Sequence, residues 1–252
     1  MKAIFLIHGF LTNKDDFKAI VPSLNEMYDK VYLFEAPGHT LEPNYALFNV
    51  NDTFKTLLKA YDELAKDYDT IDVIGFSMGG ALATYLQSVR RVRNLVLLAP
   101  ANKYINPKLL GERLKYITQN HKDMIKMKDT NPKAYDYIKN NMDALKKDDK
   151  NAMTLAFKYL FPNWTIKNLS TFAKIINKCN KELIAITSPT LIIWGKLDQL
   201  VPYDSIKYLE SLMFSNSEVV IYDDISHLML NSENNNKIID KICNFLKERG
   251  NI

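Results

Sequence analysis

The chain has 252 residues, 47% of them hydrophobic and 25% charged, with a formal net charge of +4. This composition is ordinary for a soluble globular protein, and the length suits one large α/β domain or one domain with an insertion. The only two cysteines, Cys179 and Cys243, stand far apart, which argues against a disulfide framework or a zinc site and favours a reducing cytosol.

The charge is unevenly spread, because residues 101–188 hold 17 Lys and Arg against 8 Asp and Glu. Lysines on exposed helical faces explain this excess better than a nucleic-acid or membrane surface, since no aromatic-basic motif accompanies it. The apolar run at the start of the chain is too short for a signal peptide or a membrane span. We therefore expect a cytoplasmic protein with no nucleic-acid partner and no integral membrane segment. The oligomeric state is not readable.

Short apolar runs alternate with helical patterns in the first part of the chain. The runs that predict buried strands lie at 3–7, 31–34, 68–74 and 95–98. Apolar residues at helical spacing predict helices over 14–29, from Asn51 or Asp52 to 65, and over 81–88. Strands that alternate with helices favour a parallel sheet covered on both faces.

The alternation stops after the fourth predicted strand. Residues 103–187 show only helical patterns, and strands resume at 190–194 and 218–222, followed by helices over 203–214 and 233–248. We predict a mostly parallel six-stranded α/β sheet flanked by helices, with a core formed by 1–102 and 188–252. The helical insertion 103–187 is expected to form a cap over the carboxyl edge of the sheet, where open α/β sheets place their ligands.

A Gly-x-Ser-x-Gly pentapeptide, Gly75–Gly79, joins the third predicted strand to its helix. Between a strand and a helix, this pattern is the nucleophile elbow, in which a strained turn exposes the serine hydroxyl at the end of the strand. Side chains two residues before and after the serine would collide, so glycine stands at both positions. This context favours Ser77 as a nucleophile over an ordinary glycine-rich turn.

A serine hydroxyl needs a base to take its proton and an acid to orient that base. His227 follows the last predicted strand and can reach the carboxyl edge of the sheet, which makes it the predicted base. The other three histidines are less suited. His8 and His39 are expected to shape turns, and His121 to be solvated on the cap.

Asp198 is the predicted acid because it follows the fifth strand and precedes His227, in the order that elbow hydrolases use. Asp223 and Asp224 are rivals, but they come directly after the sixth strand and can simply terminate it. No acid follows the fourth strand, which strengthens the assignment of Asp198.

The developing oxyanion needs two backbone N–H donors. Met78, at the start of the elbow helix, can supply one, and Phe10, in the loop after the first strand, the other. Predicted substrate contacts come from both the core and the cap, and they are Leu11, Phe161, Trp164 and Val201. Aromatic residues of the cap are also suited to form its own core, and this alternative stays open.

Five pieces of the chain, taken together, resemble the α/β-hydrolase family, specifically its capped carboxylesterase and monoacylglycerol-lipase-like members. They are His8-Gly9-Phe10, Pro37-Gly38-His39, Gly75–Gly80, Gly195-x-x-Asp198-x-x-Val201-Pro202 and Ser226-His227. The resemblance implies a triad of Ser77, Asp198 and His227, with Phe10 and Met78 as oxyanion donors. Two departures are the absence of the family's two leading strands and Thr40, where relatives often carry glycine.

The sequence thus predicts a serine hydrolase that cleaves carboxylic esters of small to medium acyl chains, with a small-molecule ester as its partner. Neither a cofactor nor a metal is expected. Thioesterase and carbon–carbon hydrolase or lyase activities use the same residues, and a low-turnover ligand-binding protein can keep the same fold. The sequence leaves these alternatives open, together with the natural substrate.

Overall fold

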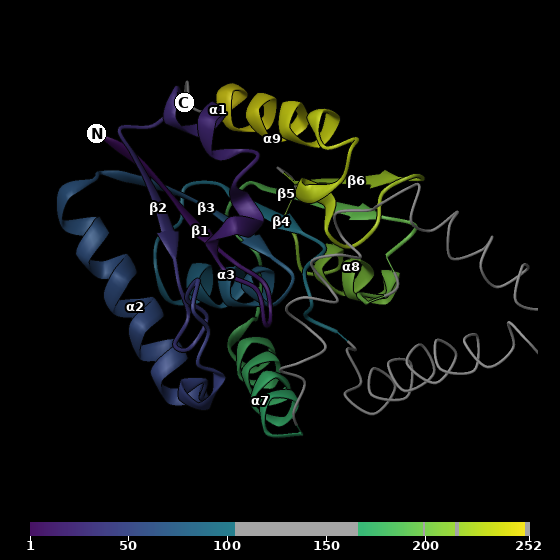
Figure 1. Cartoon of the computed structure of the whole chain (residues 1–252). Coiled ribbons are helices and arrows are strands. Elements are labelled where there is room, and N and C mark those ends of the chain that lie inside the picture. Colours follow the sequence, from purple (N-terminus) through teal and green to yellow (C-terminus); the bar gives the residue numbers. More distant parts are fainter. Residues whose placement is uncertain (104–165, 199, 215–216, 250–252) are drawn as a thin grey trace, which may run out of the picture.

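The computed structural model of this protein describes residues 1–103, 166–198, 200–214 and 217–249. Within these ranges six parallel strands form one sheet in the order β2-β1-β3-β4-β5-β6 (Figure 1). Their bounds are β1 Lys2–Ile7, β2 Lys30–Phe34, β3 Thr70–Phe76, β4 Leu95–Leu98, β5 Thr190–Gly195 and β6 Glu218–Tyr222. The predicted α/β fold with a six-stranded parallel sheet is confirmed.

Helices cover both faces of this sheet. Figure 1 shows α1 and α9 on one face and α2 and α3 on the other. The helices are η1 Lys14–Phe17, α1 Val21–Asn25, η2 Tyr45–Leu47, α2 Val50–Asp67, α3 Met78–Val89, α7 Ile166–Glu182, α8 Tyr203–Glu210, η4 Met229–Asn231 and α9 Asn236–Glu248. Every described helix falls short of the length and apolar character needed to cross a bilayer.

The central strands are buried along almost their whole length, which explains their continuous apolar runs. All residues of β4 and β5 are buried, whereas the edge strands β2 and β6 are partly exposed. A strand that is covered on both faces carries apolar side chains at every position instead of at alternate ones. The register places Gly75 of β3 beside Leu97 of β4, so these strands end at the same edge of the sheet.

The predicted helix over 14–29 is wrong as a single element, because the chain forms η1 and α1 there. The side chain of Asn13 caps η1 by accepting a hydrogen bond from the backbone of Asp15, and Pro22 stands in the first turn of α1, which begins at Val21. Proline suits the first turn of a helix, but it has no backbone N–H to donate to the carbonyl of Lys18, as a helix continuous over 14–29 would require.

Other helix starts also differ from prediction. The N-cap of α2 is Asn49, whose side-chain oxygen accepts from the amide of Asp52, in place of Asn51 or Asp52. α3 begins at Met78, directly after the elbow serine. The predicted cap boundary at 103–187 remains a prediction, since residues 104–165 lie outside the described ranges.

The chain leaves the sheet after β4 and returns through α7, and two asparagines join these points. Asn102 Nδ2 donates to Asn180 Oδ1 at 3.1 Å, and Asn180 Nδ2 donates back to the Asn102 carbonyl. Asn102 Nδ2 also donates to Thr84 Oγ1 of α3 at 2.9 Å. α7 therefore packs against α3 at a fixed place on the core.

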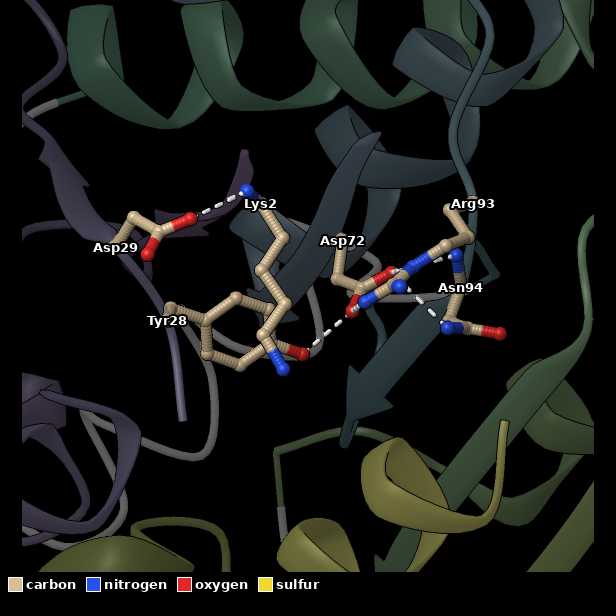
Figure 2. Close-up of polar contacts among 6 residues, drawn as sticks. All are labelled: Lys2, Tyr28, Asp29, Asp72, Arg93 and Asn94. Carbon is tan, nitrogen blue, oxygen red and sulfur yellow. Dashed lines mark hydrogen bonds and ion pairs between the residues drawn. The ribbon is translucent and has the colours of Figure 1, made fainter. Parts of the chain in front are cut away.

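A buried carboxylate organises the opposite, amino edge of the sheet (Figure 2). Asp72 of β3 has no exposure, and it accepts hydrogen bonds from Arg93 Nε at 2.8 Å and Nη2 at 2.5 Å. It also accepts from Tyr28 Oη and from the amide and side chain of Asn94. A buried charge needs such partners to offset its lost hydration. Ser77 follows the other end of β3, about 16 Å away along the strand, so this network is structural.

Candidate active site

The nucleophile elbow is formed as a strained turn between β3 and α3. Ser77 has φ 53° and ψ −113°, a backbone conformation that non-glycine residues rarely adopt. A Cβ atom on Gly75 would lie 2.3 Å from the carbonyl oxygen of Gly79, and one on Gly79 would lie 1.9 Å from that of Ile7. Glycine is therefore required at both positions. The first turn of α3 packs directly against the end of β1.

The structure brings Ser77, His227 and Asp198 into one hydrogen-bonded chain. His227 Nε2 lies 3.1 Å from Ser77 Oγ, and His227 Nδ1 lies 2.7 Å from Asp198 Oδ2. All three residues are buried. A carboxylate only accepts hydrogen bonds, so His227 donates its Nδ1–H to Asp198. This leaves Nε2 of the neutral ring as an acceptor for the Ser77 hydroxyl.

The carboxylate of Asp198 is itself held in place by the loop after β5. Its Oδ1 accepts from the backbone N–H groups of Leu200 and Val201, both at 2.8 Å. The carbonyl of Val201 in turn accepts from Trp194 Nε1 at 2.9 Å. One oxygen therefore binds the loop and the other binds His227, which fixes the orientation of the carboxylate.

The rival acids lie in exposed ion pairs instead. Asp223 is 2.6 Å from Lys196 Nζ, and Asp224 is 2.5 Å from Lys237 Nζ. Both carboxylates are solvated at the end of β6. Asp198 is the acid that contacts His227 Nδ1.

His8 and His39 form a buried pair beside the loop after β1, with ring centroids 5.1 Å apart. His8 Nε2 accepts from the amide of Ala36 at 3.0 Å, and its Nδ1 lies 2.7 Å from the carbonyl of Gly9. Burial lowers the pKa of His8 to about 4. Burial, together with the neighbouring His8, lowers the pKa of His39 to about 3. Both rings are therefore neutral near pH 7. Their contacts join the loop after β1 to the loop after β2. His121 lies outside the described residues.

The predicted oxyanion donors lie on the two segments that meet at the elbow. Phe10 is buried, with its ring 4.7 Å from Phe172 of α7 and 5.8 Å from Phe48. Met78 is fully buried at the start of α3, where backbone N–H groups and the helix dipole favour negative charge. Because Gly79 packs against Ile7, the loop that contains Phe10 begins beside Met78.

The structure describes two of the four residues predicted to contact substrate. Leu11 and Val201 are fully buried, and Leu11 has φ 56° while its carbonyl accepts from Tyr45 Oη at 2.9 Å. Phe161 and Trp164 lie outside the described residues. Contact with substrate stays a prediction for all four.

Sequence reasoning missed Asp16, a buried carboxylate beside the loop after β1. Its Oδ2 accepts from the amide of Gly9 at 3.0 Å and from Thr12 Oγ1 at 2.5 Å. Burial, the largest cause, raises the pKa of Asp16 to about 6, while the hydrogen bonds from Gly9 and Thr12 act in the opposite direction. Residue type alone does not distinguish Asp16 from its exposed neighbour Asp15.

Across the described residues, no three His, Cys, Asp or Glu side chains gather closely enough to hold a metal ion. The hydrogen-bonded chain of Ser77, His227 and Asp198 can support nucleophilic chemistry, because it places a serine, a base and an acid in line.

Known proteins that are similar to this chain include lipases and a carboxylesterase. Lipase 1 of Psychrobacter immobilis is 25% identical over 238 residues, which cover 89% of this chain and 71% of the lipase. A carboxylesterase of Bacillus subtilis is 19% identical over 250 residues, covering 98% and 93% of the two chains. The structure of Paleococcus ferrophilus monoacylglycerol lipase, 18% identical, has a TM-score of 0.67 and covers 98% of this chain and 94% of that one.

The structural likeness shows a shared fold. A model of the alpha/beta hydrolase fold family matches residues 2–232, which is most of the chain. This protein belongs to the alpha/beta hydrolase family.

Proposed function

We propose that this protein is a serine hydrolase that cleaves carboxylic esters of small to medium acyl chains through an acyl-enzyme on Ser77. The observation that carries the proposal is the hydrogen-bonded chain from Ser77 Oγ to His227 and on to Asp198, at 3.1 Å and 2.7 Å. Relatives named lipase and carboxylesterase support an ester as the substrate class.

In the first half of the reaction, Ser77 Oγ attacks the ester carbonyl carbon while His227 Nε2 takes the hydroxyl proton. Asp198 stabilises the imidazolium that forms. The carbonyl oxygen becomes an oxyanion, which the backbone N–H groups of Phe10 and Met78 bind. When the intermediate collapses, the carbon–oxygen bond to the alcohol breaks, and His227 gives its proton to the departing oxygen.

In the second half, water replaces the alcohol. His227 takes a proton from water as its oxygen attacks the acyl-enzyme carbonyl, and the same N–H groups bind the second oxyanion. Collapse breaks the bond to Ser77 Oγ, which recovers its proton from His227, and the carboxylic acid leaves. The buried site suits this chemistry because electrostatic interactions are stronger where water is excluded.

The test is hydrolysis of p-nitrophenyl esters from acetate to palmitate by the wild type and by Ser77→Ala. We expect a maximum at one chain length, and a loss of about a thousandfold or more in kcat for the variant. Ser211→Ala is the matched control, because Ser211 is exposed at the end of α8. A fluorophosphonate probe should label the wild type and the control but not Ser77→Ala.

Equal hydrolysis by the wild type and Ser77→Ala would contradict the proposal. Labelling of Ser77 without ester turnover would instead direct attention to thioesters or carbon–carbon substrates, which need the same triad. If the protein shows no labelling and no turnover, a ligand-binding role is favoured.

A further inference from the structure

We propose that Asp16 is a positioning residue that holds the loop after β1 in the shape required to bind the oxyanion. This inference rests on the proposed function. It concerns a side chain outside the triad, and it assigns a task to a buried carboxylate that the mechanism above does not use.

Asp16 connects two residues of the loop after β1 through one oxygen atom. A single oxygen, Asp16 Oδ2, accepts from Gly9 N at 3.0 Å and from Thr12 Oγ1 at 2.5 Å. These two donors flank Phe10 and Leu11, so one atom closes both ends of a two-residue segment. Leu11 has φ 56°, a conformation that a leucine does not hold without support from its surroundings. The carboxylate therefore fixes the course of the backbone that presents the Phe10 N–H.

Asp16 is itself held in place by the contacts of η1. Its own amide donates to the carbonyl of Asn13 at 3.1 Å, within the short helix η1. Phe17, the next residue, is fully buried, and Lys14 of η1 pairs with Glu35 at 3.4 Å. A positioning group must itself be held by packing and hydrogen bonds, and these contacts of η1 supply both.

The charge of the Asp16 carboxylate strengthens its contacts with the loop. The charged and titratable groups around Asp16 are His227, from the loop after β6, and Asp15 on η1. The pKa of Asp16, raised to about 6 by burial, leaves the carboxylate mostly ionised above that pH. The ionised Oδ2 is a strong acceptor, so near pH 7 it holds both hydrogen bonds to the loop.

The test compares Asp16→Ala and Asp16→Asn with Asp15→Asn, the exposed neighbour on the same short helix. kcat and KM are measured on the best p-nitrophenyl ester between pH 5 and pH 9. Asp16→Ala should lower kcat by about tenfold or more and change KM by less than about threefold, because oxyanion binding acts in the transition state. Asp16→Asn keeps an oxygen that can accept both hydrogen bonds, so it should recover most of kcat above pH 7. Asp15→Asn should match the wild type.

A second measurement reports on the loop without any substrate. In protein labelled with ¹⁵N-glycine, the amide resonance of Gly9 should shift as Asp16 titrates near pH 6 in the wild type and stay constant in Asp16→Asn. This arm still decides the question if Asp16→Ala does not fold.

The outcomes separate the two proposals. If Ser77 is neither labelled by fluorophosphonate nor able to hydrolyse esters, the proposed function fails, and the Gly9 titration still tests whether Asp16 holds the loop. If folded Asp16→Ala keeps kcat within about twofold of the wild type, or differs from it only in KM, Asp16 is not a positioning residue. A Gly9 resonance that does not move with pH also overturns the inference.

Discussion

Gly79 lies directly against the end of β1, where its Cα approaches the carbonyl of Ile7 so closely that a Cβ would be 1.9 Å from that oxygen. The contact brings the first turn of α3 to the loop after β1. Both predicted oxyanion donors, Phe10 and Met78, therefore depend on one close approach of two backbones.

Gly79→Ala should separate these segments, because a backbone carbonyl cannot move aside as a flexible side chain can. We expect poor folding or, in folded protein, a loss of about a hundredfold or more in kcat. Gly80→Ala is the control variant, because alanine causes a milder clash at this position. Its Cβ would be 2.8 Å from Pro100, a less severe clash. Ester turnover and thermal unfolding check both variants. Equal effects of the two would contradict the importance of the Ile7 contact.

Asp72→Asn should destabilise the protein without changing its chemistry. The network in Figure 2 surrounds Asp72 near the start of β3, whereas Ser77 follows the end of that strand. Removing one charge from a buried pair leaves Arg93 uncompensated and costs about 3–5 kcal/mol. The matched control is Asp62→Asn, which breaks a pair with Arg90 that is about as short but more exposed. It should cost at most about 1 kcal/mol. Chemical unfolding measures both, and similar costs would show that burial does not matter here.

The Asp16 carboxylate, which we propose holds the loop after β1, should lower the stability of the folded protein at neutral pH. The pKa of Asp16 rises from 3.8 to about 6 on folding, so the folded protein binds this proton more tightly than the unfolded chain does. The contribution of Asp16 to the free energy of unfolding is therefore greatest below about pH 4 and is lost as pH rises through about 6. The loss amounts to about 3 kcal/mol. The wild type should be less stable relative to Asp16→Asn at pH 7 than at pH 4, as measured by urea unfolding. Parallel pH curves for the two proteins would refute this.

His39 should act in the opposite direction. Its pKa falls from 6.5 to about 3 on folding, chiefly through burial. The unfolded chain therefore takes up a proton that the folded protein refuses, and stability is lost as pH falls below about 6.5. Between pH 7.5 and pH 5 the wild type should lose about 2 kcal/mol relative to His39→Phe, which does not titrate. The reference is the difference between the two proteins at pH 7.5, where both are neutral at this position.

The sheet and the proximity of the three predicted triad residues could be predicted from sequence because each depends on local pattern. Buried strands read as apolar runs, and the carboxyl ends of parallel strands meet at one edge. Ser77, Asp198 and His227 each follow a different strand, so their order along the chain was enough to expect them together. Asp223 and Asp224 were the harder case. Their ion pairs with lysines depend on side-chain directions that no spacing rule gives.

Asp16 could not be predicted for a different reason. Its position depends on the break between η1 and α1, which the apolar spacing of residues 14–29 conceals. Its hydrogen bonds also join a helix to a loop that precedes it by several residues, an arrangement set by packing and not by periodicity. The N-cap of α2 was missed on a smaller scale. Asn49, Asn51 and Asp52 are all good caps, and the tertiary path of the chain selects among them.

The paired asparagines join the two described segments that flank residues 104–165. Because Asn102 and Asn180 bind each other, the place where the chain leaves the sheet and the place where it returns are held together beside α3. We expect relatives to differ in the length and composition of the stretch between them while Ser77 stays where β3 places it.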